Sequence, residues 1–134
     1  MRILIAVSRG WKDWDTVRRA YDEATAAHPN EVITVVHGNN PDGDREAARI
    51  ATVRGCVTEG HDANWSAYGN AAGPIRNQEM VNAHADVCLA FIRPCRKAGC
   101  RKPKPHDSHG ASDCVSKARA AGISVWTYRS GDDE

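Results

Sequence analysis

ILIAVSRGW (residues 3–11) begins with an uninterrupted apolar run, Ile3–Val7, and ends in a polar turn. Further short apolar runs follow along the chain; they are VITVV at Val32–Val36, VCLAF at Val87–Phe91 and ISVW at Ile123–Trp126. The runs are continuous instead of alternating and most are rich in β-branched residues, as is typical of strands buried on both faces of a parallel sheet. They predict four main strands, with a minor strand at Gly55–Thr58.

Helical patterns separate these runs. The first has one apolar face at intervals of three and four residues and stops at Pro29; its members are Trp14, Val17, Tyr21, Ala24 and His28. Further helices are expected at Asp44–Arg54, after the Gly73-Pro74 pair, and near Ser112–Ala121. Alternation of strand and helix predicts an α/β fold of the Rossmann-like, three-layer type, with a mainly parallel sheet flanked by helices.

Length and charge exclude several classes of protein. A chain of 134 residues is expected to form a single domain over 1–134, which excludes a large multidomain enzyme. The formal net charge of +1 excludes a globally basic nucleic-acid binder. No apolar stretch approaches the roughly 18 residues of a membrane span, and the N-terminus lacks a signal-peptide pattern. We therefore expect a cytoplasmic protein with no membrane partner.

Ligands of such sheets bind beyond the carboxyl ends of the strands, so the residues that follow each apolar run are candidates. After the first run these are Ser8, Arg9 and Trp11, and we expect Trp11 and Trp65 to line the crevice and stack a base. After the second run comes HGNNPDGD, with His37, Gly38 and Asp44. This segment is either an ordinary turn or a loop that binds phosphate at a helix N-terminus.

Two helix starts carry further candidates. The Gly73-Pro74 pair places Arg76 and Asn77 in the first turn of a helix, where a cation is unfavourable unless an anion joins it. Arg76 is therefore either a clamp for phosphate or carboxylate, or a solvated surface residue.

The second start lies in HDSHGASDC, which places the turn Gly110-Ala111-Ser112 before the last helix. Ser112 or Asp113 caps that helix, or the turn binds a second anion. In the second case Asp113 holds a ribose hydroxyl or acts as an acid or base.

Residues 93–110, RPCRKAGCRKPKPHDSHG, form an insertion far longer than the connections usual in such folds. Cys95, Cys100, His106 and His109 provide two thiolates and two imidazoles, a complete tetrahedral shell for a structural Zn²⁺. The alternatives are a mobile loop with unpaired thiols and a Cys95–Cys100 disulfide.

The same insertion is strongly basic and has no acidic residue before Asp107; its cations are Arg93, Arg96, Lys97, Arg101, Lys102 and Lys104. The loop closes over a phosphorylated ligand, contacts nucleic acid, or is simply solvated. No aromatic residues interleave to stack bases, which disfavours nucleic acid as a partner.

Several segments in the same order resemble the SLOG superfamily, and most closely its small YspA-related proteins from actinobacteria and their phages; they are SRGW, HG, AAGPIRNQEMV, ADVCLAF and GASDCVSKARAAGI. The resemblance implies a Rossmann-like fold and a nucleotide or nucleotide-derived signalling ligand. For a phage-encoded chain it implies the host cytoplasm. Relatives often associate, so a homo-oligomer is also expected.

Carried over to this chain, the resemblance implies a crevice formed by Ser8, Arg9, His37, Gly38, Asp44, Gly73, Arg76, Asn77, Gly110 and Asp113. Arg76 with Met80 is similar to a motif of the cytokinin-activating LOG enzymes, which hydrolyse the N-glycosidic bond of nucleoside monophosphates. Those enzymes carry PGGxGTxxE, whereas this chain has HDSHGASDC, with Cys114 in place of the glutamate.

Three hypotheses follow. The first is a protein that binds a nucleotide-derived ligand. The second is a LOG-like phosphoribohydrolase with Arg76 and Asp113 as catalytic residues, and the third is a nucleic-acid-associated module that uses the basic loop.

Overall fold

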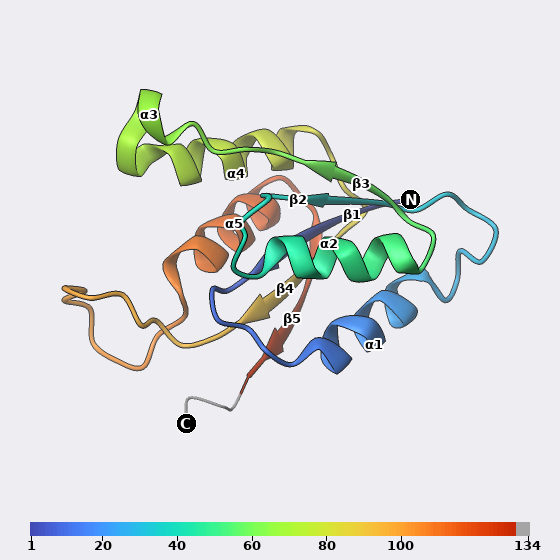
Figure 1. The fold of residues 1–134 in the computed structure, drawn as a ribbon, viewed down its shortest axis with the longest axis horizontal. Helices are drawn as coiled ribbons and strands as arrows, with labels where there is room; N and C mark the ends of the chain where they lie inside the picture. Colours follow the sequence, from blue (N-terminus) through green and yellow to red (C-terminus); the bar gives the residue numbers. More distant parts are fainter. Residues whose placement is uncertain (131–134) are drawn as a thin grey trace.

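The computed structural model describes residues 1–130 and contains one five-stranded sheet (Figure 1). All strand pairs are parallel and the strand order is β3-β2-β1-β4-β5. The strands are β1 (Arg2–Val7), β2 (Thr34–His37), β3 (Val57–Gly60), β4 (Val87–Ile92) and β5 (Ser124–Arg129). The α/β class expected from the apolar runs is confirmed.

Helices cover both faces of this sheet (Figure 1). They are α1 (Trp14–Thr25), α2 (Asp44–Val53), α3 (Trp65–Tyr68), the 3₁₀ turn η1 (Gly69–Ala71), α4 (Ala72–Asn82) and α5 (His109–Ala120). Helices α1 and α2 pack on one face, and α4 and α5 on the other. This arrangement is the three-layer, Rossmann-like architecture.

The core consists of two halves, one on each side of the sheet. In β4, Leu89 and Phe91 pack toward α1 and α2, whereas Cys88 and Ala90 pack toward α4 and α5. Because both faces of β4 are buried, every position in this strand is apolar and its sequence shows no alternation. Edge strand β3 is mostly exposed, which explains its polar sequence VTEG.

Several element boundaries differ from the sequence-based expectation. Strand β2 begins at Thr34, and Val32 is exposed, because the apolar run extends beyond the segment that pairs with β1. Helix α1 ends at Thr25, before His28. Helix α5 begins at His109 with Ser108 as its N-cap, so the residues expected to form a turn before it are already helical.

The start of α4 also differs. The helix begins at Ala72, so Gly73 and Pro74 lie within its first turn and Arg76 is its fifth residue. Among the described helices, none is long and apolar enough to cross a membrane.

Phe91 provides a test of the core. Its ring is fully buried between Trp11, at 5.6 Å between ring centroids, and Tyr128, at 5.3 Å. We expect Phe91→Ala to lower the free energy of unfolding by about 3–5 kcal/mol, since it removes a large buried side chain and leaves a cavity.

The matched control is Val53→Ala on α2, where the side chain is 74% exposed. Its effect should stay within about 0.5 kcal/mol. Equilibrium urea unfolding measures both variants, and equal losses would contradict this description of the core.

Candidate functional site

Side chains from two helices meet the loop after β2 at the carboxyl edge of the sheet. Arg76 of α4 donates a hydrogen bond from Nη1 to the carbonyl oxygen of Gly38, at 2.7 Å, and from Nε to Oδ1 of Asn77, at 3.1 Å. The helix begins earlier than expected, so Arg76 does not lie in its first turn. Contacts with oxygen acceptors, and not the helix N-terminus, therefore hold this guanidinium.

Gly38 lies directly against the guanidinium. A Cβ at this position would lie 2.7 Å from Nη1 of Arg76 and 2.9 Å from Oδ2 of Asp44. Both distances are shorter than real Cβ contacts, so a side chain here would displace the arginine or the carboxylate. Glycine at this position lets Arg76 and Asp44 approach the same stretch of backbone.

Asp44 is the first residue of α2 and is only 6% exposed. Its Oδ2 accepts a hydrogen bond from the backbone N–H of Asn40, at 3.2 Å. Burial raises the pKa of this carboxyl to about 6, although the Asn40 N–H and the charge of Arg76 act in the opposite direction. Asp44 therefore gains or loses a proton close to neutral pH.

Asn77 links α4 to α5. Its side chain is buried, and Nδ2 donates to Oδ2 of Asp113, at 2.9 Å, and to the carbonyl oxygen of Gly110, at 3.4 Å. The other oxygen of Asp113 accepts a hydrogen bond from Lys117. Lys117 is a site residue that was not expected from the sequence, although its i+4 spacing from Asp113 is the signal of a helical ion pair.

Two residues that were expected to contact the ligand instead contact other residues of the protein. Trp11 is 3% exposed and packs on Phe91, so its ring belongs to the core and does not stack a base, contrary to expectation. Ser8 lies at the edge, but its hydroxyl is 2.6 Å from that of Ser108 and accepts from the Arg93 N–H, at 3.0 Å.

His37 is buried beside Gly60, and its Nδ1 accepts a hydrogen bond from the Asn39 N–H, at 3.0 Å. Burial lowers the pKa of its imidazole, so the ring is neutral at pH 7. Because Gly60 belongs to β3, the ring of His37 lies against that strand.

The remaining expected residues are distributed around this site. Gly73 lies under Trp65, and Arg9 is exposed in the turn after β1. Ser112 lines a different cavity, of about 190 Å³, between α5 and β5, whereas Asp113 faces α4. The structure therefore brings together Gly38, Asp44, Arg76, Asn77, Gly110 and Asp113.

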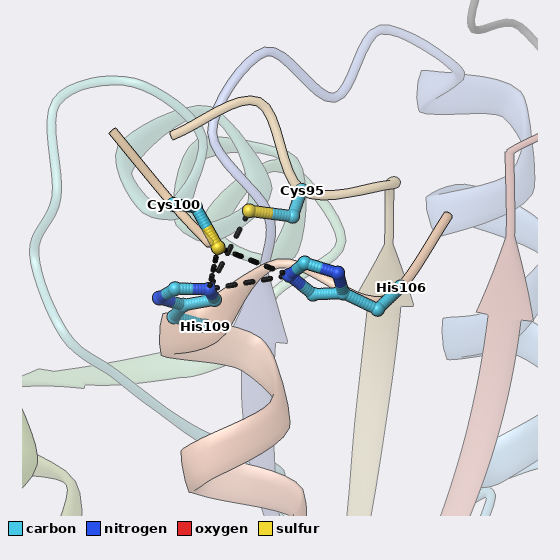
Figure 2. Close-up of side chains that lie close together, drawn as sticks. All are labelled: Cys95, Cys100, His106 and His109. Carbon is cyan, nitrogen blue, oxygen red and sulfur yellow. Dashed lines mark hydrogen bonds between the residues drawn. The ribbon is translucent and has the colours of Figure 1, made fainter. Parts of the chain in front are cut away.

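The inserted loop brings its two cysteines and two histidines together (Figure 2). Their donor atoms, Sγ of Cys95 and Cys100 and Nε2 of His106 and His109, all lie within 4.8 Å of one another. Both cysteines are free thiols, which argues against the disulfide alternative. This cluster could hold a metal ion.

The separations among the donors of Cys100, His106 and His109 match the edges of a tetrahedral site. The two Nε2 atoms are 3.3 Å apart, and Sγ of Cys100 lies 3.5 Å from His106 and 3.4 Å from His109. With bonds of about 2.3 Å to sulfur and about 2.0–2.1 Å to nitrogen, a tetrahedron has N···N edges of about 3.3 Å and S···N edges of about 3.5 Å.

Groups around the cluster favour the protonation states in which its side chains can bind a metal. Nδ1 of His106 lies 2.8 Å from the carbonyl oxygen of Pro103, which places its proton there and leaves Nε2 free to bind a metal. A backbone hydrogen bond from Lys102, with the charges of Lys104 and Lys102 in support, lowers the pKa of the Cys100 thiol. Burial and nearby lysines lower the pKa of His109. Each shift favours the deprotonated ligand.

An all-parallel α/β sheet flanked by helices on both faces defines a Rossmann-like protein, and polar side chains gather at the carboxyl edge of its sheet. The model of the YspA, cpYpsA-related SLOG family matches residues 1–68. The chain belongs to this family, and membership suggests a nucleotide-related ligand. The match includes Gly38 and Asp44 and ends before Arg76.

The chain is also similar to the Gene 61 protein of Mycobacterium phage D29. The two are 39% identical, and the comparison covers 95% of each chain. It is consistent with the expected distribution among actinobacterial phages. No solved structure matches the chain.

Asp44→Asn tests the buried carboxyl. Because burial raises its pKa from 3.8 to about 6, the folded protein binds more protons than the unfolded chain between these pH values. The free energy of unfolding should therefore fall as pH rises from about 4 to 6, by at most about 3 kcal/mol from this group.

In Asp44→Asn this component of the pH dependence should disappear, whereas Asp42→Asn, an exposed control in the same loop, should keep it. Thermal or urea unfolding at several pH values measures the difference. Parallel pH profiles for wild type and Asp44→Asn would contradict the assignment.

Proposed function

We propose that this protein binds a nucleotide or nucleotide-derived signalling ligand at the carboxyl edge of the sheet, with Arg76 as the group that holds phosphate. The observation that carries the proposal is the guanidinium of Arg76, half-buried between Gly38 and α4. Arginine stays charged at physiological pH and matches phosphate through its planar array of donors. Within residues 1–130, the contacts with Gly38 and Asn77 use two of its five N–H groups.

A nearby aromatic ring favours a nucleotide over inorganic phosphate. Trp65 is 53% exposed, and a Cβ on Gly73 would lie 3.5 Å from its ring. Gly73 lies one helical turn before Arg76 on α4. An exposed ring at this distance provides a surface on which a base stacks while its phosphate contacts Arg76.

Arg76→Ala tests this site. We expect the affinity for the best-bound member of a panel containing AMP, GMP, CMP and UMP to fall by about 10- to 100-fold, the value of a charged hydrogen-bonding group. Arg76→Lys should recover only part of the affinity, since lysine keeps the charge and loses the planar array.

Arg49→Ala is the matched control, because Arg49 is exposed on α2 and pairs with Glu46. Isothermal titration calorimetry measures all four proteins. Unchanged affinity in Arg76→Ala would exclude the site, and no binding of any nucleotide by the wild type would overturn the proposed function.

A second candidate is LOG-like hydrolysis of a nucleoside monophosphate. The observation that favours it is the Asp44 carboxyl, whose pKa of about 6 suits an acid or base near neutral pH and which lies beside Arg76. Asp113, the acid or base expected from the sequence, pairs instead with Lys117 and Asn77. Chromatography of incubated nucleotides separates the candidates: released free base supports hydrolysis, and intact bound ligand supports binding alone.

We also propose that Cys95, Cys100, His106 and His109 hold a structural Zn²⁺. Two sulfur and two nitrogen donors complete the tetrahedral shell that zinc prefers and leave no position open for substrate. The loop between β4 and α5 has few apolar residues, so a metal would supply the order that a core cannot.

Protein purified without a histidine tag should contain one zinc ion per chain by elemental analysis. Cys95→Ser and Cys100→Ser should lower this content to near zero, because each removes a thiolate ligand. Cys56→Ser should leave it at one, since Cys56 is a free thiol outside the cluster. Wild-type protein without stoichiometric zinc would contradict the proposal.

A further inference from the structure

The metal cluster and the candidate phosphate site share one helix. His109, a member of the cluster, is the first residue of α5. Gly110 is the second residue of the same helix and Asp113 lies one turn after His109, and both contact Asn77 on α4. A contact that holds the start of α5 in place therefore also holds Gly110 and Asp113, which accept hydrogen bonds from Asn77.

A chain of hydrogen bonds continues from these acceptors to Arg76. Asn77 donates to Asp113, at 2.9 Å, and its Oδ1 accepts from Nε of Arg76, at 3.1 Å. The side chain of Asn77 is 4% exposed, so it contacts protein groups on both sides and has little surface left for a ligand. It is placed to orient Arg76 and not to bind the ligand itself.

A second connection ties the end of the loop to β1. Ser108 bonds to the hydroxyl of Ser8, and its backbone N–H donates to the carbonyl oxygen of Arg93, at 3.0 Å. The loop is also closed by the hydrogen bond from the Cys95 N–H to the carbonyl oxygen of His106, at 2.7 Å. The start of α5 is therefore held at the site by the same segment that carries the metal ligands.

Beyond these bonds, the base of this segment is held by the bridge between Pro94 and Asp107 and by the ion pair of Asp107 with Arg129, whereas its middle is exposed. Residues 96–105 are exposed or half-exposed, and the cations Arg96, Lys97, Arg101, Lys102 and Lys104 repel one another within it. A bound metal would join its two arms through Cys95 and Cys100 on one side and His106 and His109 on the other. Without metal, the start of α5 loses that constraint.

We infer that Asn77 is a positioning residue that couples the metal centre to the phosphate site, so that metal and nucleotide favour each other's binding. The inference rests on the proposed function. Metal fixes the first turn of α5, Asp113 and Gly110 then hold Asn77, and Asn77 orients the guanidinium of Arg76. Linkage requires that each ligand raise the affinity for the other by the same factor.

AMP affinity measured with zinc-loaded and chelator-treated protein tests the coupling. Wild type should bind AMP at least about fivefold more tightly when loaded, the lower end of typical allosteric coupling. Saturating AMP should raise zinc affinity, measured by competition with a chelating dye, by the same factor. Far-UV circular dichroism confirms that the metal-free protein remains folded.

Asn77→Ala should bring the ratio of the two AMP affinities close to one, because it breaks the connection while leaving the metal ligands in place. Gln78→Ala is the matched control: its amide is exposed, bonds to Asn82 on the same helix, and should leave the ratio as in wild type. A metal that merely stabilises the whole fold would give Asn77→Ala the wild-type ratio.

Two results would overturn the coupling while the proposed function stands: equal AMP affinity of loaded and metal-free wild type, or an unchanged ratio in Asn77→Ala. Failure of loaded wild type to bind AMP or any other nucleotide of the panel is a different result. It would overturn the proposed function, and the coupling with it.

Discussion

Strand β1 pairs in parallel with both β2 and β4, and the position of every candidate site residue depends on this arrangement. Parallel pairing brings the carboxyl ends of the three central strands to one edge of the sheet (Figure 1). In the strand order, β2 lies on one side of β1 and β4 lies on the other. Ligands of such folds bind at this switch point, where the order of the strands reverses. The loops that carry Gly38, Ser8 and Arg93 therefore meet there.

The charges of Arg76 and Asp44, which lie beside the same stretch of backbone at Gly38, respond differently to pH. Arginine keeps its charge at physiological pH, whereas burial raises the pKa of the Asp44 carboxyl to about 6. An arriving phosphate would repel ionised Asp44 and pair with Arg76, so the protonated form of Asp44 is the one compatible with an anion. Gly38 permits this geometry, because any side chain there would occupy the space between the two groups.

The loop between β4 and α5 differs from the rest of the fold in how little apolar surface it buries. The sheet and its helices are held by apolar burial, but this loop exposes most of its residues and contributes Cys95 to the buried set. Its Cys₂His₂ cluster could hold a metal in place of a core. Because His109 belongs both to the cluster and to α5, a metal bound there would constrain the start of that helix.

The sequence by itself determined the strand runs, their parallel arrangement and the set of potential metal ligands, since burial on both faces and ligand chemistry leave direct traces in residue type. It also placed Arg76 and Asn77 in a helix at the correct edge. Only the tertiary structure decided that Trp11 is a core residue, that Ser112 faces another cavity and that Asn77 contacts Asp113. Those outcomes depend on which helix packs beside which, and local sequence patterns contain no information on the partner that a side chain meets across the fold.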